Sequence, residues 1–317
     1  MDVSEVLDDL VAEQQALDDV VASLTPEKWQ LATPSPGWTI ADQIGHLTYF
    51  DGTAALAITD PTASPRLRRI DQRVTSASES NTEGVDPPDA VTPSARRPTN
   101  NTPPAGFAEE MNRLLGAGTT GESADDITLA PYRAMAADEL LAAWRANRSA
   151  LDAAGATLDN DTRVAWYGPS MGAKSFLTAR LMEAWAHGQD IVDALDDGAD
   201  RPPTDRLRHI SQLGVITRGW TYVNRGLEVP SAAVRIELTS PSGASWTFGD
   251  EGAPESIVGP ALDFCLVTTQ RRHVDDTDLV VTGAAARDWM KKAQLFAGPP
   301  SDGPAPRPTE PEERGPR

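Results

Sequence analysis

The sequence has very little cysteine and no long apolar run. Its 317 residues include a single cysteine, Cys265, which excludes an intrachain disulfide and a thiolate zinc cluster. No stretch of about 18 apolar residues occurs, so we expect no membrane-spanning helix. The N-terminal segment is acidic and lacks the apolar run of a signal peptide. From these absences we expect a protein of the reducing cytoplasm.

Positive charge is also scarce. Lysine and arginine together number 28 against 47 acidic residues, which gives a net charge of −19. Binding to nucleic acid requires a basic face that neutralises phosphates. We therefore expect no nucleic-acid partner and no membrane partner, and a small-molecule substrate or thiol instead. Composition leaves the oligomeric state open.

Two segments lack large apolar side chains. Residues 61–106 are rich in Pro, Ser, Thr and Asn, and the end of the chain, residues 299–317, is rich in Pro, Glu and Arg. Such segments bury too little apolar surface to offset the entropy of ordering the chain. We expect a disordered insert at about 61–106 and a disordered tail at 299–317.

The remainder of the first 200 residues has helical periodicity. Apolar residues recur every three or four positions in four segments, which predicts long helices over 2–24, 39–58, 136–156 and 172–195. A turn that starts at Thr25 predicts a short helix through Leu31. We expect these helices to pack as a bundle.

The segment from 205 to 298 has a different pattern, which predicts a small α+β domain. Alternating apolar residues in VRIELTS and SWTF flank a Pro241-Ser242-Gly243 turn, which is typical of a hairpin. The expected order is a helix at 205–225, strands at 234–240 and 245–248, a helix at 257–271, a strand at 278–283 and a helix at 285–296. The fold class of the whole chain is therefore α+β.

Glu183 and His187 are four residues apart on one predicted helix. That spacing places both side chains on the same face, one turn apart, where they can bind one ion. An ion pair or a solvated face would have the same spacing. However, the two residues share a stripe with Phe176 and Ala179, and burying unpaired polar groups costs on the order of 2–7 kcal/mol. A metal ion would remove that penalty.

His46 adds a second imidazole from another helix. It flanks the apolar stripe of Ile40, Ile44 and Leu47, where a lone histidine is usually a hydrogen-bonded structural residue. Together with the pair above, it completes a set of two imidazoles and one carboxylate, which leaves a coordination position open, as in catalytic sites. Zinc is the expected metal, although nickel, iron or cobalt also suit these ligands. We expect His209 and His273 to be surface or capping residues.

These residues carry a resemblance to a known family. The pattern Gly37-Trp38-Thr39, Asp42 and His46-Leu47, followed by Glu183-x-x-x-His187, resembles the metal-binding domain of mycothiol-dependent maleylpyruvate isomerases, in the DinB/YfiT-like metalloenzyme superfamily. The resemblance covers residues 1–200 without the insert, and the segments 166–171 and 178–190 look like an actinobacterial branch. It implies an up-down four-helix bundle in which His46, Glu183 and His187 bind a divalent metal, with mycothiol as a candidate thiol cofactor.

The C-terminal half has weaker resemblances. Its α+β order resembles the second domain of these isomerases, where an arginine is implied in handling the thiol; Arg271 or Arg272 is the candidate, and a surface salt bridge is the alternative. It also resembles a segment associated with wyosine-base formation in tRNA modification. We discount an RNA role because one cysteine cannot provide three-cysteine iron–sulfur ligation and because the chain is acidic.

Three further residues have candidate roles. Asp190, three residues after His187, could orient that imidazole or could be solvated. Arg180, three residues before Glu183, could pair with the carboxylate. Cys265 follows Phe264 in an apolar context and is expected in the core.

Three hypotheses for the site remain. In the first, the protein is an isomerase or transferase in which zinc activates a low-molecular-weight thiol or water, since a zinc-bound thiol loses its proton. In the second, it is a non-catalytic metal-binding regulatory or small-molecule-binding protein. In the third, the residues form a buried hydrogen-bond cluster without metal. An open coordination position favours the enzyme, and a closed shell of four protein ligands favours a structural role.

Overall fold

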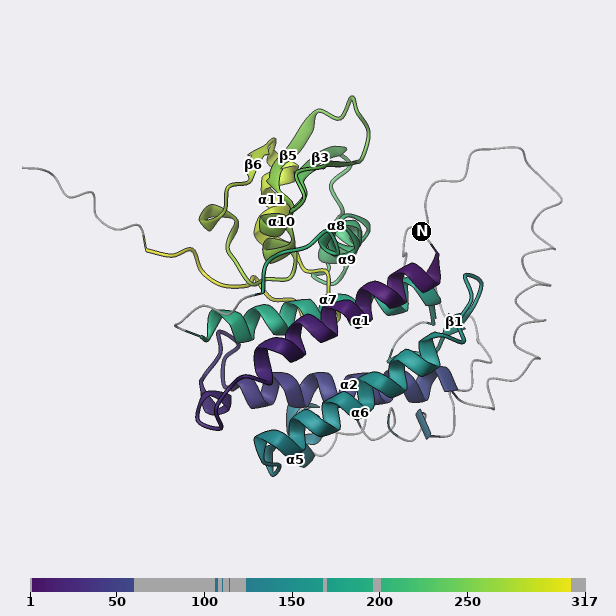
Figure 1. Cartoon of the computed structure of the whole chain (residues 1–317). Helices are drawn as coiled ribbons and strands as arrows, with labels where there is room; N and C mark the ends of the chain where they lie inside the picture. The colour runs from purple at the N-terminus through teal and green to yellow at the C-terminus, as the bar shows by residue number, and fades with distance from the viewer. Residues whose placement is uncertain are drawn as a thin grey trace, which may run out of the picture. The chain divides into compact units, whose positions relative to one another are not determined.

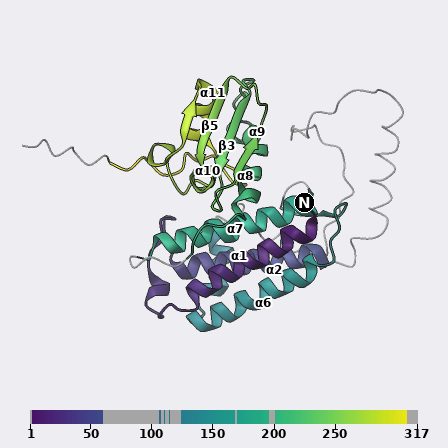
Figure 2. The ribbon, with the colours of Figure 1, turned by 45° about the horizontal axis from the view of Figure 1, so that its top comes forward.

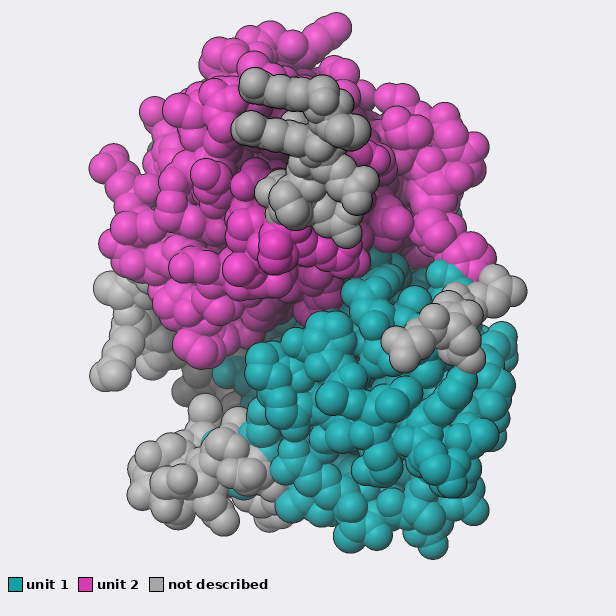
Figure 3. Space-filling view, turned by 90° about the vertical axis from the view of Figure 1, so that its left-hand side faces the viewer, with its two compact units in different colours: residues 1–201 teal, residues 202–317 magenta. Residues whose placement is uncertain are grey.

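A computed structural model describes most of the chain in two compact units, residues 1–201 (unit 1) and 202–317 (unit 2), which Figure 3 colours separately. The described residues are 2–59, 106, 107, 110, 114, 124–167, 170–195 and 201–308. The predicted insert lies outside them apart from Gly106, as does most of the expected tail. Among the described helices, none combines the length and apolar content needed to cross a bilayer.

Unit 1 is built from four long helices that lie side by side in Figures 1 and 2: α1 (Val3–Val21), α2 (Ile40–Thr59), α6 (Ala137–Gly155) and α7 (Ala173–Asp193). The four predicted helices are confirmed, with ends shifted by a few residues. Both α1 and α2 pack against α6 and α7, so the order around the bundle is α1, α7, α2, α6.

One apolar cluster fixes the directions of these helices. It joins the last turns of α1 and α7 to the first turns of α2 and α6, through buried side chains that include Leu17, Ile191, Ile40 and Leu140. Consequently α2 and α6 run in the same direction, opposite to α1 and α7. Parallel neighbours need a long connection, which the chain between residues 59 and 137 provides. The helices therefore do not simply alternate up and down along the chain.

The start of α2 positions the candidate site. The Thr39 hydroxyl accepts from the Asp42 backbone N–H at 3.2 Å, and the Asp42 carboxylate accepts from the Thr39 N–H at 2.9 Å, as expected for a capping box. Asp42 also accepts a hydrogen bond from Arg133 at 2.7 Å, which connects α2 to α5 (Ala124–Arg133), a helix not predicted from the sequence.

The expected helix after Thr25 is only a short 3₁₀ turn, η1 (Lys28–Gln30). Unit 1 also contains a two-stranded sheet, β1 (Arg163–Val164) with β2 (Met171–Gly172).

Unit 2 contains a four-stranded sheet in the order β4-β3-β5-β6. Its strands are β3 (Val234–Thr239), β4 (Ser245–Phe248), β5 (Glu255–Pro260) and β6 (Val280–Thr282). The predicted hairpin β3–β4 is confirmed, while β3 and β5 pair in parallel and β5 and β6 pair antiparallel. Its helices are α8 (Leu207–Ile216), α9 (Arg218–Val223), α10 (Ala261–Thr268) and α11 (Ala284–Lys292), with the 3₁₀ turn η2 (Val274–Asp276).

Two predictions in unit 2 are wrong in detail. The helix expected at 257–271 begins only at Ala261, because the preceding residues form β5, where Ile257 is fully buried opposite Ile236 of β3. The helix expected at 205–225 is interrupted at Thr217, whose hydroxyl donates to the Leu213 carbonyl at 2.7 Å. Such back-bonding by threonine bends helices.

The described part of the expected tail follows unit 2. The Ser301 N–H donates to Gln294 Oε1 at 3.2 Å, and the Arg307 N–H donates to the Asp276 carboxylate at 3.0 Å. Both hydrogen bonds connect residues of the expected tail to unit 2. Residues 309–317 lie outside the described part of the chain.

Candidate metal centre

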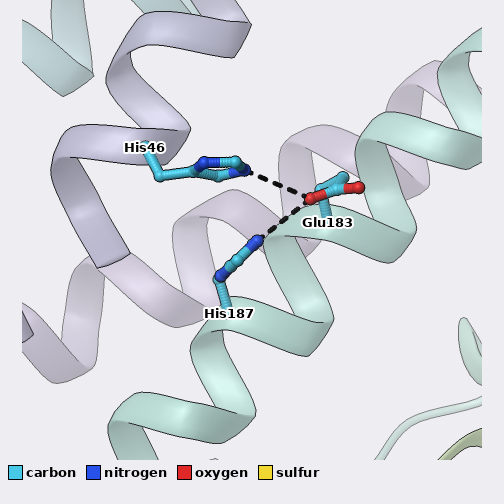
Figure 4. A group of neighbouring side chains, drawn as sticks. All are labelled: His46, Glu183 and His187. Carbon is cyan, nitrogen blue, oxygen red and sulfur yellow. Dashed lines mark hydrogen bonds and ion pairs between the residues drawn. The ribbon is translucent and has the colours of Figure 1, made fainter. Parts of the chain in front are cut away.

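Two helices of unit 1 bring His46, Glu183 and His187 together. His46 projects from α2, and Glu183 and His187 project from the antiparallel α7; Figure 4 shows both imidazoles directing a ring nitrogen at the same carboxylate. Glu183 Oε2 lies 3.0 Å from His187 Nε2 and 3.4 Å from His46 Nε2. The sequence-predicted ligands therefore converge on one point, although 137 residues separate His46 from Glu183.

The spacing of these three atoms matches the edge lengths of a zinc coordination shell. Ligands about 2.1 Å from one tetrahedral ion lie roughly 3.4 Å apart. The two measured separations, 3.0 and 3.4 Å, are close to this value, and one ligand atom from each of the three residues lies within 4.8 Å of the others. Among the residues that the structure describes, no other group of three or more His, Cys, Asp or Glu side chains has this geometry.

A chain of hydrogen bonds determines which nitrogen of neutral His187 carries the proton. The Thr33 hydroxyl donates to the Trp38 carbonyl at 3.0 Å, so it accepts from Gln43 Nε2 at 2.8 Å. The oxygen of that amide, Gln43 Oε1, then lies 2.5 Å from His187 Nδ1 and accepts a hydrogen bond from the Nδ1–H group. Because Nδ1 is held as the donor to Gln43, Nε2 is the nitrogen of His187 that can offer a lone pair to a metal, as in metal-binding imidazoles.

The charges of the site also suit a cation. Although burial by itself raises the pKa of Glu183, hydrogen bonds from His187 and His46 hold that pKa well below its usual value. Burial, followed by the neighbouring His187, lowers the pKa of His46 to about 4, so this imidazole is neutral at pH 7. Glu183 is therefore ionised, and Nε2 of His187 and Nε2 of His46 both lie at hydrogen-bond distance from its carboxylate. A divalent cation can take the place of the protons that these contacts share, so the residues fit a divalent metal.

Aromatic rings cover one side of the three residues, and the other side reaches solvent. The Trp38 ring stacks on His187 with centroids 5.8 Å apart, and Phe50 lies 4.6 Å from the His46 ring. The side chains of His46, Glu183 and His187 still retain 17%, 19% and 11% of their exposure. An ion held there would be accessible to water or a small ligand, which corresponds to an open site.

The other candidate residues lie elsewhere or have different contacts. Asp190 Oδ2 is 3.9 Å from His187 Nδ1 and accepts from Ser35 at 3.1 Å, so Gln43 is the nearer partner of the imidazole. Asp190 is also buried rather than solvated. Arg180 Nη2 is 3.9 Å from Glu183 Oε1, a long ion pair.

The two arginines suggested for thiol handling are in unit 2, directly after α10. Arg271 donates to the Thr269 carbonyl at 2.8 Å, and Arg272 lines a small cavity beside His273 and Lys291. Neither residue belongs to the unit that contains the three candidate ligands.

The remaining histidines and the cysteine have structural positions. His273 caps η2 by accepting from the Asp275 N–H, as expected, whereas His209 is buried in α8 rather than at the surface. Cys265 is completely buried, and burial raises the pKa of its thiol to about 12. A thiol with this pKa is unreactive at neutral pH.

Sequence reasoning did not identify Gln43 and Trp38 as parts of the site. Gln43 lies three residues before His46, on the same side of α2, so its helical position was the available signal. Its contact with His187 spans 144 residues and depends on how the helices pack. Trp38 belongs to the quoted Gly37-Trp38-Thr39 pattern, but its stacking on His187 could not be read from the chain.

Comparisons with known proteins find relatives over most of the chain. Two uncharacterized Mycobacterium tuberculosis proteins, MT0041 and Rv0036c, are each 37% identical to the chain over 297 residues, covering 93% of it and 96% of the relative.

Solved structures of the mycothiol-dependent maleylpyruvate isomerase are also similar to the chain. A mutant form matches with a TM-score of 0.49 and 15% identity, covering 87% of this chain and 91% of that one. A second crystal structure of the isomerase gives 0.47 and 16%, covering 86% and 90%. The model of the mycothiol maleylpyruvate isomerase N-terminal domain matches residues 10–192, which include all three candidate ligands. The chain therefore belongs to the family of the mycothiol maleylpyruvate isomerase N-terminal domain.

Proposed function

We propose that this protein is a zinc-dependent enzyme that uses a low-molecular-weight thiol, mycothiol or a close relative, in an isomerase or transferase reaction. The observation that supports the metal is the convergence of His46 Nε2, His187 Nε2 and Glu183 Oε2 from two helices. Family membership supports the thiol and the type of reaction.

The residues of the chain divide the work of such a site. His46, Glu183 and His187 would hold the ion, and Gln43 keeps His187 in the tautomer that offers Nε2. Zinc bound there would supply a Lewis acid that lowers the pKa of a thiol or a water molecule. Trp38 and Phe50 keep bulk water from the covered side of the imidazoles. Cys265 takes no part, because its thiol is buried and protonated.

A metal-binding regulator or small-molecule-binding protein is the alternative. Three protein ligands with partial exposure leave a position for an exchangeable ligand, which supports catalysis over a closed structural site. The two hypotheses differ in turnover and not in metal content.

Metal content tests the central part of the proposal. Purified wild-type protein should hold about one zinc ion per chain after dialysis, measured by elemental analysis, and His187→Ala should lose it because two ligands do not retain the ion. His273→Ala, which removes an imidazole that caps η2 in unit 2, is the matched control and should keep the metal. A wild type without stoichiometric metal, or a His187→Ala variant that retains it, would refute the zinc site.

Turnover tests the chemical part. Zinc-loaded protein should isomerise maleylpyruvate, or transfer a thiol to a related electrophile, only when mycothiol is present. Stoichiometric zinc without any thiol-dependent turnover would favour the non-catalytic alternative.

A further inference from the structure

Beside the candidate zinc ligands, unit 1 buries an arginine whose donors are largely unused. Arg180 lies one turn before Glu183 on α7, and only 5% of the residue is exposed. Its Nε and Nη1 are buried and make no hydrogen bond to any residue that the structure describes. Both nitrogens carry N–H donors, which a guanidinium cannot lose by deprotonation.

Such burial is costly unless something compensates for it. The Arg180 guanidinium lies 5.2 Å from the Trp166 ring centroid and 5.8 Å from that of Phe50, and these cation–π contacts offset part of the charge. Arg180 Nη2 is 3.9 Å from Glu183 Oε1, which is too far for a hydrogen bond. The aromatic faces cannot satisfy the in-plane N–H groups, and unsatisfied donors of a buried charge are rare in folded proteins.

A second unpartnered donor lies in the same group of aromatic residues. The ring of Tyr167 is 5.8 Å from that of Phe50 and 4.8 Å from that of Trp166, the same two rings that the Arg180 guanidinium contacts. The Tyr167 hydroxyl is near Thr53 and Tyr49, but it forms no hydrogen bond of ordinary distance and angle with a described residue. Arg180 and Tyr167 thus both present buried donors.

We propose that Arg180 and Tyr167 form a subsite next to the zinc ligands that binds the carboxylate of a small organic acid with a flat apolar body. The carboxylate satisfies the donors of Arg180 and Tyr167, and the rings of Phe50 and Trp166 contact the flat body. A divalent ion together with Arg180 also outweighs the charges of Glu183 and of Glu110, the carboxylate near Tyr167, so the site attracts an anion. This inference rests on the proposed function, because it places the acid beside the zinc site as its substrate.

Benzoate is a suitable probe, since it combines a carboxylate with a flat ring, and benzamide is its neutral counterpart. Calorimetric titration of the zinc-loaded full chain should show binding of benzoate and much weaker binding of benzamide. Arg180→Gln should weaken benzoate binding at least about tenfold, because charge-assisted hydrogen bonds are lost. Tyr167→Phe, which keeps the ring and removes only the hydroxyl, should weaken it by about two- to tenfold.

Arg148→Gln is the matched control. Arg148 also stacks on a tryptophan, with its guanidinium 5.0 Å from the Trp144 ring centroid, but it is hydrogen-bonded to the Gln14 carbonyl. This variant should keep wild-type benzoate affinity. Thermal unfolding checks that each variant is folded; if Arg180→Gln is not, Tyr167→Phe decides, and an unchanged benzoate affinity in that variant overturns the subsite.

The metal content of the same samples separates this inference from the proposed function. If the wild type holds no zinc but its benzoate binding depends on Arg180, the zinc enzyme is refuted and the anion subsite stands. If zinc is bound but the wild type does not prefer benzoate to benzamide, or folded Arg180→Gln binds benzoate like the wild type, the subsite is refuted and the zinc site stands.

Discussion

At the scale of single residues, Gln43 has the most specific contact in the candidate site. Its amide oxygen accepts a hydrogen bond from Nδ1–H of His187 and its amide nitrogen donates one to Thr33, so both ends fix its orientation. Replacement of groups that orient a metal-binding histidine typically costs 10–100-fold in metal affinity, by order of magnitude. We therefore predict that Gln43→Leu weakens zinc binding by roughly 10–100-fold, measured by competition with a chelator. Gln15→Leu on the exposed side of α1 is the control, and equal zinc affinities in both variants would contradict the assigned role.

Asp51 leads to a prediction about pH. Burial raises the pKa of this carboxyl to about 6, although Trp144 Nε1 and Gln14 Nε2 both donate to its Oδ2. Between the unfolded pKa of 3.8 and about 6, folded Asp51 retains a proton that the unfolded chain releases, so its contribution to stability falls as the pH rises through this window.

Asp51→Asn removes this titration and keeps an oxygen that can accept both hydrogen bonds. The free energy of unfolding of the variant minus that of the wild type should therefore rise from about pH 3 to pH 7, by about 3 kcal/mol in total. Urea unfolding of both proteins in the presence of a chelator measures this difference, in which the other titrating groups cancel. A difference that does not change with pH would show that Asp51 is not a protonated buried carboxyl.

The local part of the site could be predicted at this scale, and the non-local part could not. The i, i+4 spacing of Glu183 and His187 is a property of any helix, so one segment of sequence sufficed to pair them. The unsatisfied donors of Arg180 and the Gln43 contact depend on side chains from other elements. Burial of Asp51 likewise follows from the packing of α2 against Trp144 of α6 and not from its neighbours in the chain.

At the scale of elements, amphipathic helices were easier to predict than short strands. The four bundle helices have long apolar stripes, whereas β5 has six residues and leads directly into α10, so its Ile257 and Val258 continued an apparently helical apolar run. Helix α5 has only ten residues and contains Pro131. Whether such a short apolar segment forms a strand or a helix depends on pairing with neighbouring strands, which sequence periodicity does not include.

Gly188 provides a test of how α7 packs. A Cβ at this position would lie 2.6 Å from the guanidinium of Arg201, which donates to the buried Glu13 and to the Trp185 carbonyl. Gly188→Ala should displace Arg201 and break its ion pair with the buried Glu13, which lowers the free energy of unfolding by about 2 kcal/mol or more.

The sign of this effect should reverse without the guanidinium. In an Arg201→Ala background, Gly188→Ala should stabilise the protein by about 0.5–1 kcal/mol, since alanine is the better helix former. Urea unfolding of the four proteins in this cycle provides the measurement. The same change in both backgrounds would mean that Arg201 does not occupy the space above Gly188.

At the scale of the whole molecule, the candidate chemistry belongs to unit 1. Its core and all three candidate ligands lie within residues 1–201. A fragment of residues 1–201 should therefore fold and bind about one zinc ion, measured by circular dichroism and elemental analysis. The same fragment with His187→Ala should fold without the metal. A fragment that is folded but binds no zinc, next to a full chain that does, would show that unit 2 contributes to the site.

The separation of the three candidate ligands along the chain has a consequence for how the protein folds. His46 meets Glu183 only after the long chain between α2 and α7 has closed on itself, and contacts of such sequence separation carry a large loop-closure entropy. We therefore expect the three ligands to assemble late, after the main folding barrier. An ion that binds a late-forming site slows unfolding and leaves the folding rate nearly unchanged. Zinc would then increase the kinetic stability of the folded bundle.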